Sequence, residues 1–165
     1  MARRELERLV PQSLLDRLID EEPRLAGDPT TTQAASADAF VAGVQRDLEW
    51  LLNTRRPPIS IPEHCTELER SAFTYGVPDT TALGRDNPAA RQRLQHWIED
   101  AIATFEPRLR DVRVTLGETT NDGLRRIRFI VRGELQMDPR PQQIAFDATL
   151  DSAGSYEVRD GANAR

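Results

Sequence analysis

The two histidines and the single cysteine of this chain could support catalysis or metal binding, but their spacing argues against both. His64 and Cys65 are adjacent and His96 is distant, which is not a metal-binding pattern. Adjacent side chains rarely point together, and no third group orients a Cys–His pair. No phosphate loop, dinucleotide fingerprint or nucleophile elbow occurs. We therefore predict no catalytic residue, no metal and no cofactor.

The segment Glu106-Pro107-Arg108 is the charged cluster that we single out among the 27 acidic and 22 basic residues. An acid paired with an arginine has a lowered pKa, which suits an ion pair better than a general acid. Two interpretations stay open: a local ion pair that closes a helix end, and a contact with a partner protein. Glu106, Pro107 and Arg108 are the predicted partner-binding residues.

These three residues should lie at a corner between a helix and a strand. The apolar pattern predicts a helix from Pro88 to Phe105, with Asn87 as its cap and proline at the first helical position. Pro107 ends the helical pattern. The period then changes to two over residues 112–116, as in a strand with one buried face.

Two further helices are expected before this corner. A long one begins at Ser36 or Asp38 and ends near Asn53, before Pro57 and Pro58. Its apolar stripe leaves Gln45, Arg46, Asp47 and Glu49 facing outward. A short one, capped by Ser13, carries Leu14, Leu15, Leu18 and Ile19 on one side. It is either folded onto the body or an arm that docks on a partner.

The second half of the chain should form strands. Residues 124–135 and 142–150 read as long strands, with a turn at 121–123 and an edge strand at 156–159. The first of these is expected to slip in phase near Gly133. Gly76 should allow positive φ in the turn at 75–79. The predicted class is α+β, with N-terminal helices packed on one face of a C-terminal, mainly antiparallel sheet of three to four strands.

Composition and charge argue against some classes of function. The net charge of −5 argues against a nucleic-acid binder, and the single cysteine fits a reducing compartment. No apolar run is long enough to cross a bilayer, so we expect no membrane insertion and a cytoplasmic location. Arg126, Arg128 and Arg132 fall on the outer face of the sheet. That face is either simply solvated or meets an acidic partner.

Several segments resemble the TssE family, baseplate subunits of bacterial type VI secretion systems that belong with the phage baseplate wedge proteins of the so-called lysozyme-like family. The resemblance runs from about Ser13 to Val158. It rests on residues 13–18, the run Arg46-Asp47-Leu48-Glu49-Trp50-Leu51-Leu52-Asn53-Thr54-Arg55-Arg56, the turn at 75–79, Glu106-Pro107-Arg108 and residues 146–151. We divide the chain into an arm and linker (1–35), a wedge domain (36–160) and a frayed tail (161–165).

The resemblance implies a structural, non-enzymatic role at the cytoplasmic face of the inner membrane. Implied partners are the baseplate proteins TssF, TssG and TssK-like subunits, and the sheath proteins of the TssB and TssC type. Members of the family are thought to start sheath growth by offering an open sheet edge to strands of the first sheath ring.

A second hypothesis, suggested by the older family name and by Glu106, is a peptidoglycan hydrolase. Clearing of purified cell walls that is lost in Glu106→Gln would support it. Under the first hypothesis, replacing Glu106 or Arg108 should weaken assembly without unfolding the monomer.

Overall fold

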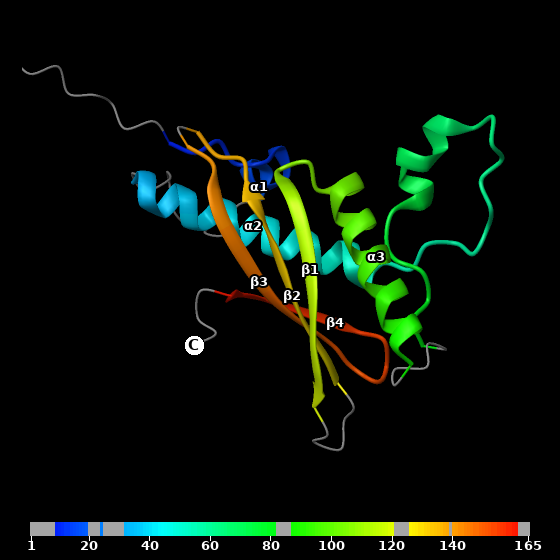
Figure 1. Ribbon diagram of the computed structural model, residues 1–165. Helices are drawn as coiled ribbons and strands as arrows, with labels where there is room; N and C mark the ends of the chain where they lie inside the picture. Colours follow the sequence, from blue (N-terminus) through cyan, green and yellow to red (C-terminus); the bar gives the residue numbers. More distant parts are fainter. Residues whose placement is uncertain are drawn as a thin grey trace, which may run out of the picture.

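The computed structural model describes residues 9–19, 24, 32–81, 87–120, 126–138 and 140–161 (Figure 1). The helical elements come first: α1 (Leu14–Leu18), α2 (Gln33–Asn53), the short 3-10 helices η1 (Thr66–Arg70) and η2 (Ala72–Thr74), and α3 (Pro88–Phe105). Four strands follow: β1 (Leu109–Thr120), β2 (Arg126–Leu135), β3 (Gln142–Leu150) and β4 (Tyr156–Asp160). The predicted turn at 121–123 lies outside the described residues.

Side-chain caps set where the helices begin. The hydroxyl of Ser13 accepts from the N–H of Asp16, and the amide oxygen of Asn87 accepts from the N–H of Ala89, as expected. α2 begins earlier than predicted, at Gln33, because Thr32 accepts from the N–H of Ala35 and supplies a cap that the apolar pattern did not reveal.

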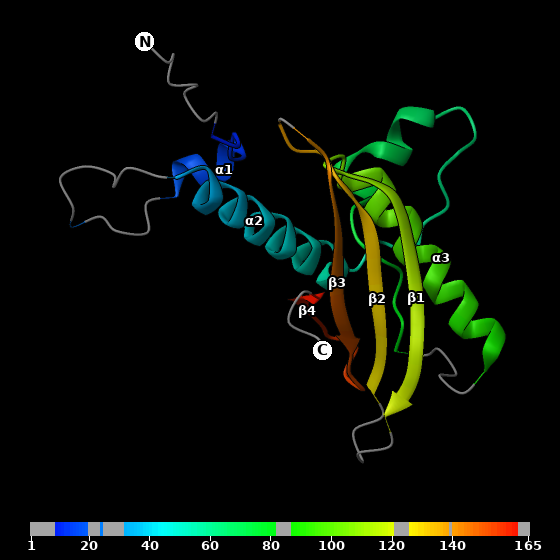
Figure 2. The same cartoon turned by 60° about the vertical axis from the view of Figure 1, so that its left-hand side comes forward.

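The strands form one antiparallel sheet in the order β1-β2-β3-β4. Figures 1 and 2 show the long helices α2 and α3 on one side of this sheet. α3 packs along β1, and α2 packs along β4. The predicted α+β class is therefore confirmed, with four strands and a meander topology.

The core lies between the two helices and the inner face of the sheet. β2 alternates without interruption: Ile127, Phe129, Val131, Gly133 and Leu135 are all buried. The predicted phase slip near Gly133 is wrong, because glycine itself occupies an inward position. The largest fully buried side chains on the other elements are Phe146, Leu150, Leu48, Leu51, Leu52, Leu94, Ile98 and Ile102.

Backbone hydrogen bonds join the turn at 75–79 to the residues that directly follow α2. Gly76 has a φ of +105°, as predicted. The N–H of Val77 donates to the carbonyl of Thr54 over 2.9 Å, and the N–H of Arg56 donates back to Val77 over 3.0 Å. The ring of Tyr75 then meets Phe105 at the end of α3, with ring centroids 5.3 Å apart. No helix in the described part of the chain combines the length and apolar character of a membrane span.

Candidate functional site

The corner between α3 and β1 is held by its own backbone before any side chain acts. The N–H of Glu106 donates to Ile102 over 2.8 Å and closes the last turn of α3. Pro107 is exposed and prevents the helix from continuing. The N–H of Leu109 donates to the carbonyl of Glu106 over 3.1 Å, and β1 starts there. The predicted corner is therefore present.

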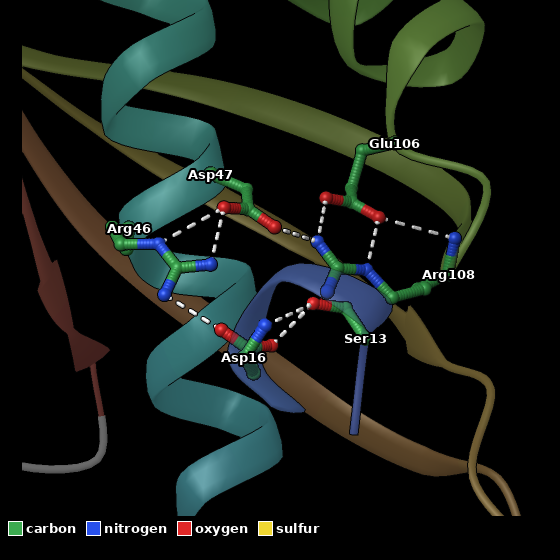
Figure 3. Close-up of polar contacts among 6 residues, drawn as sticks. All are labelled: Ser13, Asp16, Arg46, Asp47, Glu106 and Arg108. Atoms are coloured by element: carbon green, nitrogen blue, oxygen red, sulfur yellow. Dashed lines mark hydrogen bonds and ion pairs between the residues drawn. The ribbon is translucent and has the colours of Figure 1, made fainter. Parts of the chain in front are cut away.

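The structure joins Glu106 and Arg108 in a forked ion pair (Figure 3). Arg108 Nε donates to Glu106 Oε1 over 2.6 Å, and Nη2 donates to Oε2. Glu106 is 4% exposed, so this carboxylate is out of contact with bulk water. Both of its oxygens are engaged by a guanidinium, an arrangement that suits charge pairing rather than proton donation.

A second acid, from α2, also pairs with Arg108. Nη2 of Arg108 also lies 2.5 Å from Oδ2 of Asp47. Burial opposes the positive charge, but hydrogen bonds and attraction from Glu106 and then Asp47 outweigh it, and the pKa of Arg108 is raised above its ordinary value. The pKa of Tyr75 nearby is raised, first by burial and then by the charges of Asp47 and Glu106.

The network continues from α2 to α1. Arg46 donates to Asp47 Oδ1 over 2.8 Å, and its Nη1 lies 2.6 Å from Asp16 Oδ1. The hydroxyl of Ser13 donates to the other oxygen of Asp16. Burial raises the pKa of Asp16, but the bonds from Ser13 and Arg46 outweigh this effect and lower it. We call this set of contacts the ion-pair network; it is made of Ser13, Asp16, Arg46, Asp47, Arg108 and Glu106.

The ion-pair network holds α1 by the polar side of that helix and leaves the apolar side exposed. The backbone before α1 is also held, because the N–H of Val10 donates to the Ser36 hydroxyl over 3.1 Å. Leu14 and Leu18 are 73% and 76% exposed. This segment is therefore folded onto the body, and Leu14 and Leu18 have no contact among the described residues that buries them. Docking of the segment on a partner stays a prediction.

A groove connects α1 to the corner. It has a volume of about 380 Å³ and is lined by Ser13, Leu15, Asp47, Leu51, Tyr75, Phe105, Glu106, Pro107 and Arg108. Its walls combine apolar side chains with four members of the ion-pair network, Ser13, Asp47, Glu106 and Arg108. Nη1 of Arg108 is buried beside it, and no acceptor among the described residues bonds this atom.

At the β4 edge, side chains of α2 form hydrogen bonds with backbone groups that point away from β3. Asn53 accepts from the N–H of Tyr156 over 2.9 Å and donates to its carbonyl over 2.8 Å. Gln45 donates to the carbonyl of Val158 over 2.9 Å. The amide of Asn53 thus makes the pair of bonds that a neighbouring strand would make.

The β1 edge is capped in the same way by α3. The N–H of Val114 donates to the Glu99 carboxylate over 2.8 Å, and Arg91 donates to the carbonyl of Gly117. The sheet edges that the resemblance implies to be open are therefore open only in part, because helix side chains already bond some of their backbone groups.

The sequence did not reveal the partners of the predicted site. Gln45, Arg46 and Asp47 were expected to face outward, but each is partly buried and bonded across elements. They lie beside the apolar stripe of α2 and so reach toward β4, α1 and the corner. A signal was available in the run Arg46-Asp47, a charged pair flanking buried Leu48, but its partners are distant in the chain. His96 is exposed, and its Nδ1 lies 2.7 Å from the carbonyl of Gln92.

Comparison with known proteins identifies the family. A solved structure described as the baseplate complex from the type VI secretion system contains a similar chain, with a TM-score of 0.52 and 18% identity over 69% of this chain and 94% of that chain. At that identity the similarity establishes the fold. No curated protein gives a significant match. The family model described as baseplate wedge protein gp25 matches residues 38–140. Because this match covers more than half of the chain, the protein belongs to the baseplate wedge protein gp25 family, as its resemblance to TssE-type subunits predicted.

Proposed function

We propose that this protein is a non-catalytic wedge subunit of a type VI secretion baseplate and that it starts sheath growth by accepting a strand at its sheet edge. Family membership supports a structural role in a baseplate, and the fold agrees with it. The main observation in support of the proposal is the ion-pair network, which holds the exposed leucines of α1 next to the Glu106-Pro107-Arg108 corner.

The proposed docking surface for other wedge proteins is formed by α1, the groove and the corner. Exposed apolar side chains that gather on one short element typically mark an interaction site. Leu9, Leu14, Leu15, Leu18 and Ile19 are all at least 44% exposed. Glu106 is buried, so its proposed part is to orient Arg108, while Pro107 and the leucines would make direct contacts. The TssF-, TssG- and TssK-type proteins are the proposed partners.

Replacing Leu14 and Leu18 with glutamine tests this surface. Both side chains are exposed, so the thermal midpoint should stay nearly unchanged. Co-purification with TssF- and TssG-type proteins should fall at least about tenfold, because each lost apolar contact contributes about 1 kcal/mol or more. Ile59→Gln is the matched control, since Ile59 is 63% exposed on a distant loop. Undiminished co-purification of the double variant would contradict the proposed surface.

For strand addition, we propose the β4 edge. β1 is interrupted by register shifts at Arg110/Arg113 and Leu116/Thr119, and Asp111 has a φ of +51°. Such bulges usually protect an edge from pairing. β4 pairs with β3 without a shift. Its caps are neutral amides, whereas those of β1 are charged and bind more strongly. A sheath strand would therefore displace Asn53 and Gln45 at lower cost.

Removing the β4 caps tests this choice. The double variant Asn53→Ala and Gln45→Ala should shorten the lag of sheath polymerisation on reconstituted baseplates, because an incoming TssB- or TssC-type strand no longer competes with the caps. Light scattering follows the lag. Glu99→Gln at β1 is the control and should leave it unchanged. A shorter lag with Glu99→Gln alone would instead assign the β1 edge.

A further inference from the structure

The outer face of the sheet carries three arginines where β1 lies beside β2. Arg113 of β1 stands directly opposite Arg132 of β2, and Arg110 stands opposite Glu134, two residues further along β2. All three arginines are exposed. We call Arg110, Arg113 and Arg132 the arginine patch. It lies on the face opposite the buried side chains of β2, because its members occupy or pair with the outward positions of that strand. Figure 2 shows that α2 and α3 lie together on one side of the sheet.

Other arginines on the same face are neutralised within the protein. Arg128 forms a forked ion pair with Asp147, and Arg159 pairs with Glu157 over 2.5 Å. These pairs show that the sheet can place carboxylates beside its guanidinium groups.

No such carboxylate serves the arginine patch among the described residues. On its other side Arg132 faces Ala145 of β3. Glu134, opposite Arg110, accepts instead from the amides of Gln136 and Gln143, over 2.9 and 3.3 Å. Within the described part of the chain, the one hydrogen bond of the Arg113 side chain goes to the carbonyl of Val112, over 3.3 Å.

A like-charged pair directly across two strands destabilises a sheet. The free subunit carries this cost at Arg113 and Arg132, and an external carboxylate would relieve it. We propose that the arginine patch is a docking site for an acidic segment of a partner protein. Side chains opposite each other lie about 5 Å apart, so acids at alternate positions of an extended segment can each meet one guanidinium in a forked contact.

An acidic protein fits this face better than a nucleic acid does. The chain has a net charge of −5, and the neighbouring arginines Arg128 and Arg159 are neutralised by Asp147 and Glu157. A phosphate backbone that continued beyond the patch would meet these ion pairs, which carry no net charge. A short acidic segment would not, since it needs to contact the patch alone.

Arg132→Glu tests the proposal in two independent ways. The new carboxylate would face Arg113, so the thermal midpoint should rise by about 2–4 °C. Binding of a fluorescein-labelled peptide with glutamates at alternate positions, followed by anisotropy at low salt, should weaken about tenfold. Arg126→Glu is the matched control, because Arg126 is exposed on the same strand and face. It should leave peptide affinity close to that of the unmodified protein.

Three outcomes would overturn the proposal. They are absence of peptide binding by the unmodified protein, equal weakening by Arg132→Glu and Arg126→Glu, and binding of single-stranded DNA in place of the peptide. The last would assign the patch to nucleic acid. Because the peptide assay needs no baseplate component, failure of the proposed wedge function would leave its result unaffected.

Discussion

Glu106→Ala is expected to lower the free energy of unfolding by about 3 kcal/mol, because it removes one partner of a largely buried ion pair. Arg108 would keep Asp47 but would lose both hydrogen bonds of the fork. Its side chain is 20% exposed, so water could compensate in part. Urea denaturation followed by circular dichroism measures the loss. Because a typical domain is stable by about 5–15 kcal/mol, the variant should stay folded, as expected from the sequence for replacement of Glu106.

The matched control for this change is Glu157→Ala. Glu157 also pairs with an arginine two residues away, but its side chain is 54% exposed. An exposed pair of this kind contributes less than about 1 kcal/mol. Equal losses in the two variants would mean that burial of Glu106 adds nothing to the free energy of unfolding, and the ion-pair network would not stabilise the fold.

Gly76→Ala is expected to be similarly damaging, for a steric reason. A Cβ at this position would lie 2.2 Å from the carbonyl oxygen of Thr54, which is backbone and has little freedom to move. The φ of +105° adds strain for any L-residue. Together these effects should cost about 3 kcal/mol or more. A lowered thermal midpoint in differential scanning calorimetry would show it.

Gly154→Ala separates strain from steric overlap. Gly154 has a φ of +87°, but the nearest atom to its added Cβ would be the guanidinium of Arg55 at 3.1 Å, at the end of a flexible side chain. We expect a loss of about 1–2 kcal/mol there. If Gly154→Ala proved as costly as Gly76→Ala, the contact with Thr54 would not be the cause.

Local signals in the sequence predicted the elements and the corner. Capping residues, prolines and apolar periods act within a few residues, so the ends of α3 and the order of the strands followed from them. The face on which Gly133 lies does not follow from such local signals. Glycine has no side chain to reveal its face, and counting it as an interruption produced a slip that the alternation of β2 does not need.

The contacts of the site could not be predicted in the same way. Asp47 is 61 residues from Arg108, and Asn53 is 103 residues from Tyr156. Whether a polar side chain at the border of an apolar stripe meets solvent or a distant partner depends on how the elements pack. The sequence therefore predicted Glu106 and Arg108 as a pair but did not reveal Asp47, Arg46 and Asp16 as its continuation.

The amides of Asn53 and Gln45 also bear on whether copies of the protein can pair with one another through β4. A regular outer strand invites identical copies to zip together into fibrils. With its hydrogen-bonding groups already engaged, β4 offers a second copy little gain from such pairing. Under the proposed function, a subunit that seeds a polymer would thereby be kept from polymerising with itself, and growth would begin where a sheath strand competes successfully for the β4 edge.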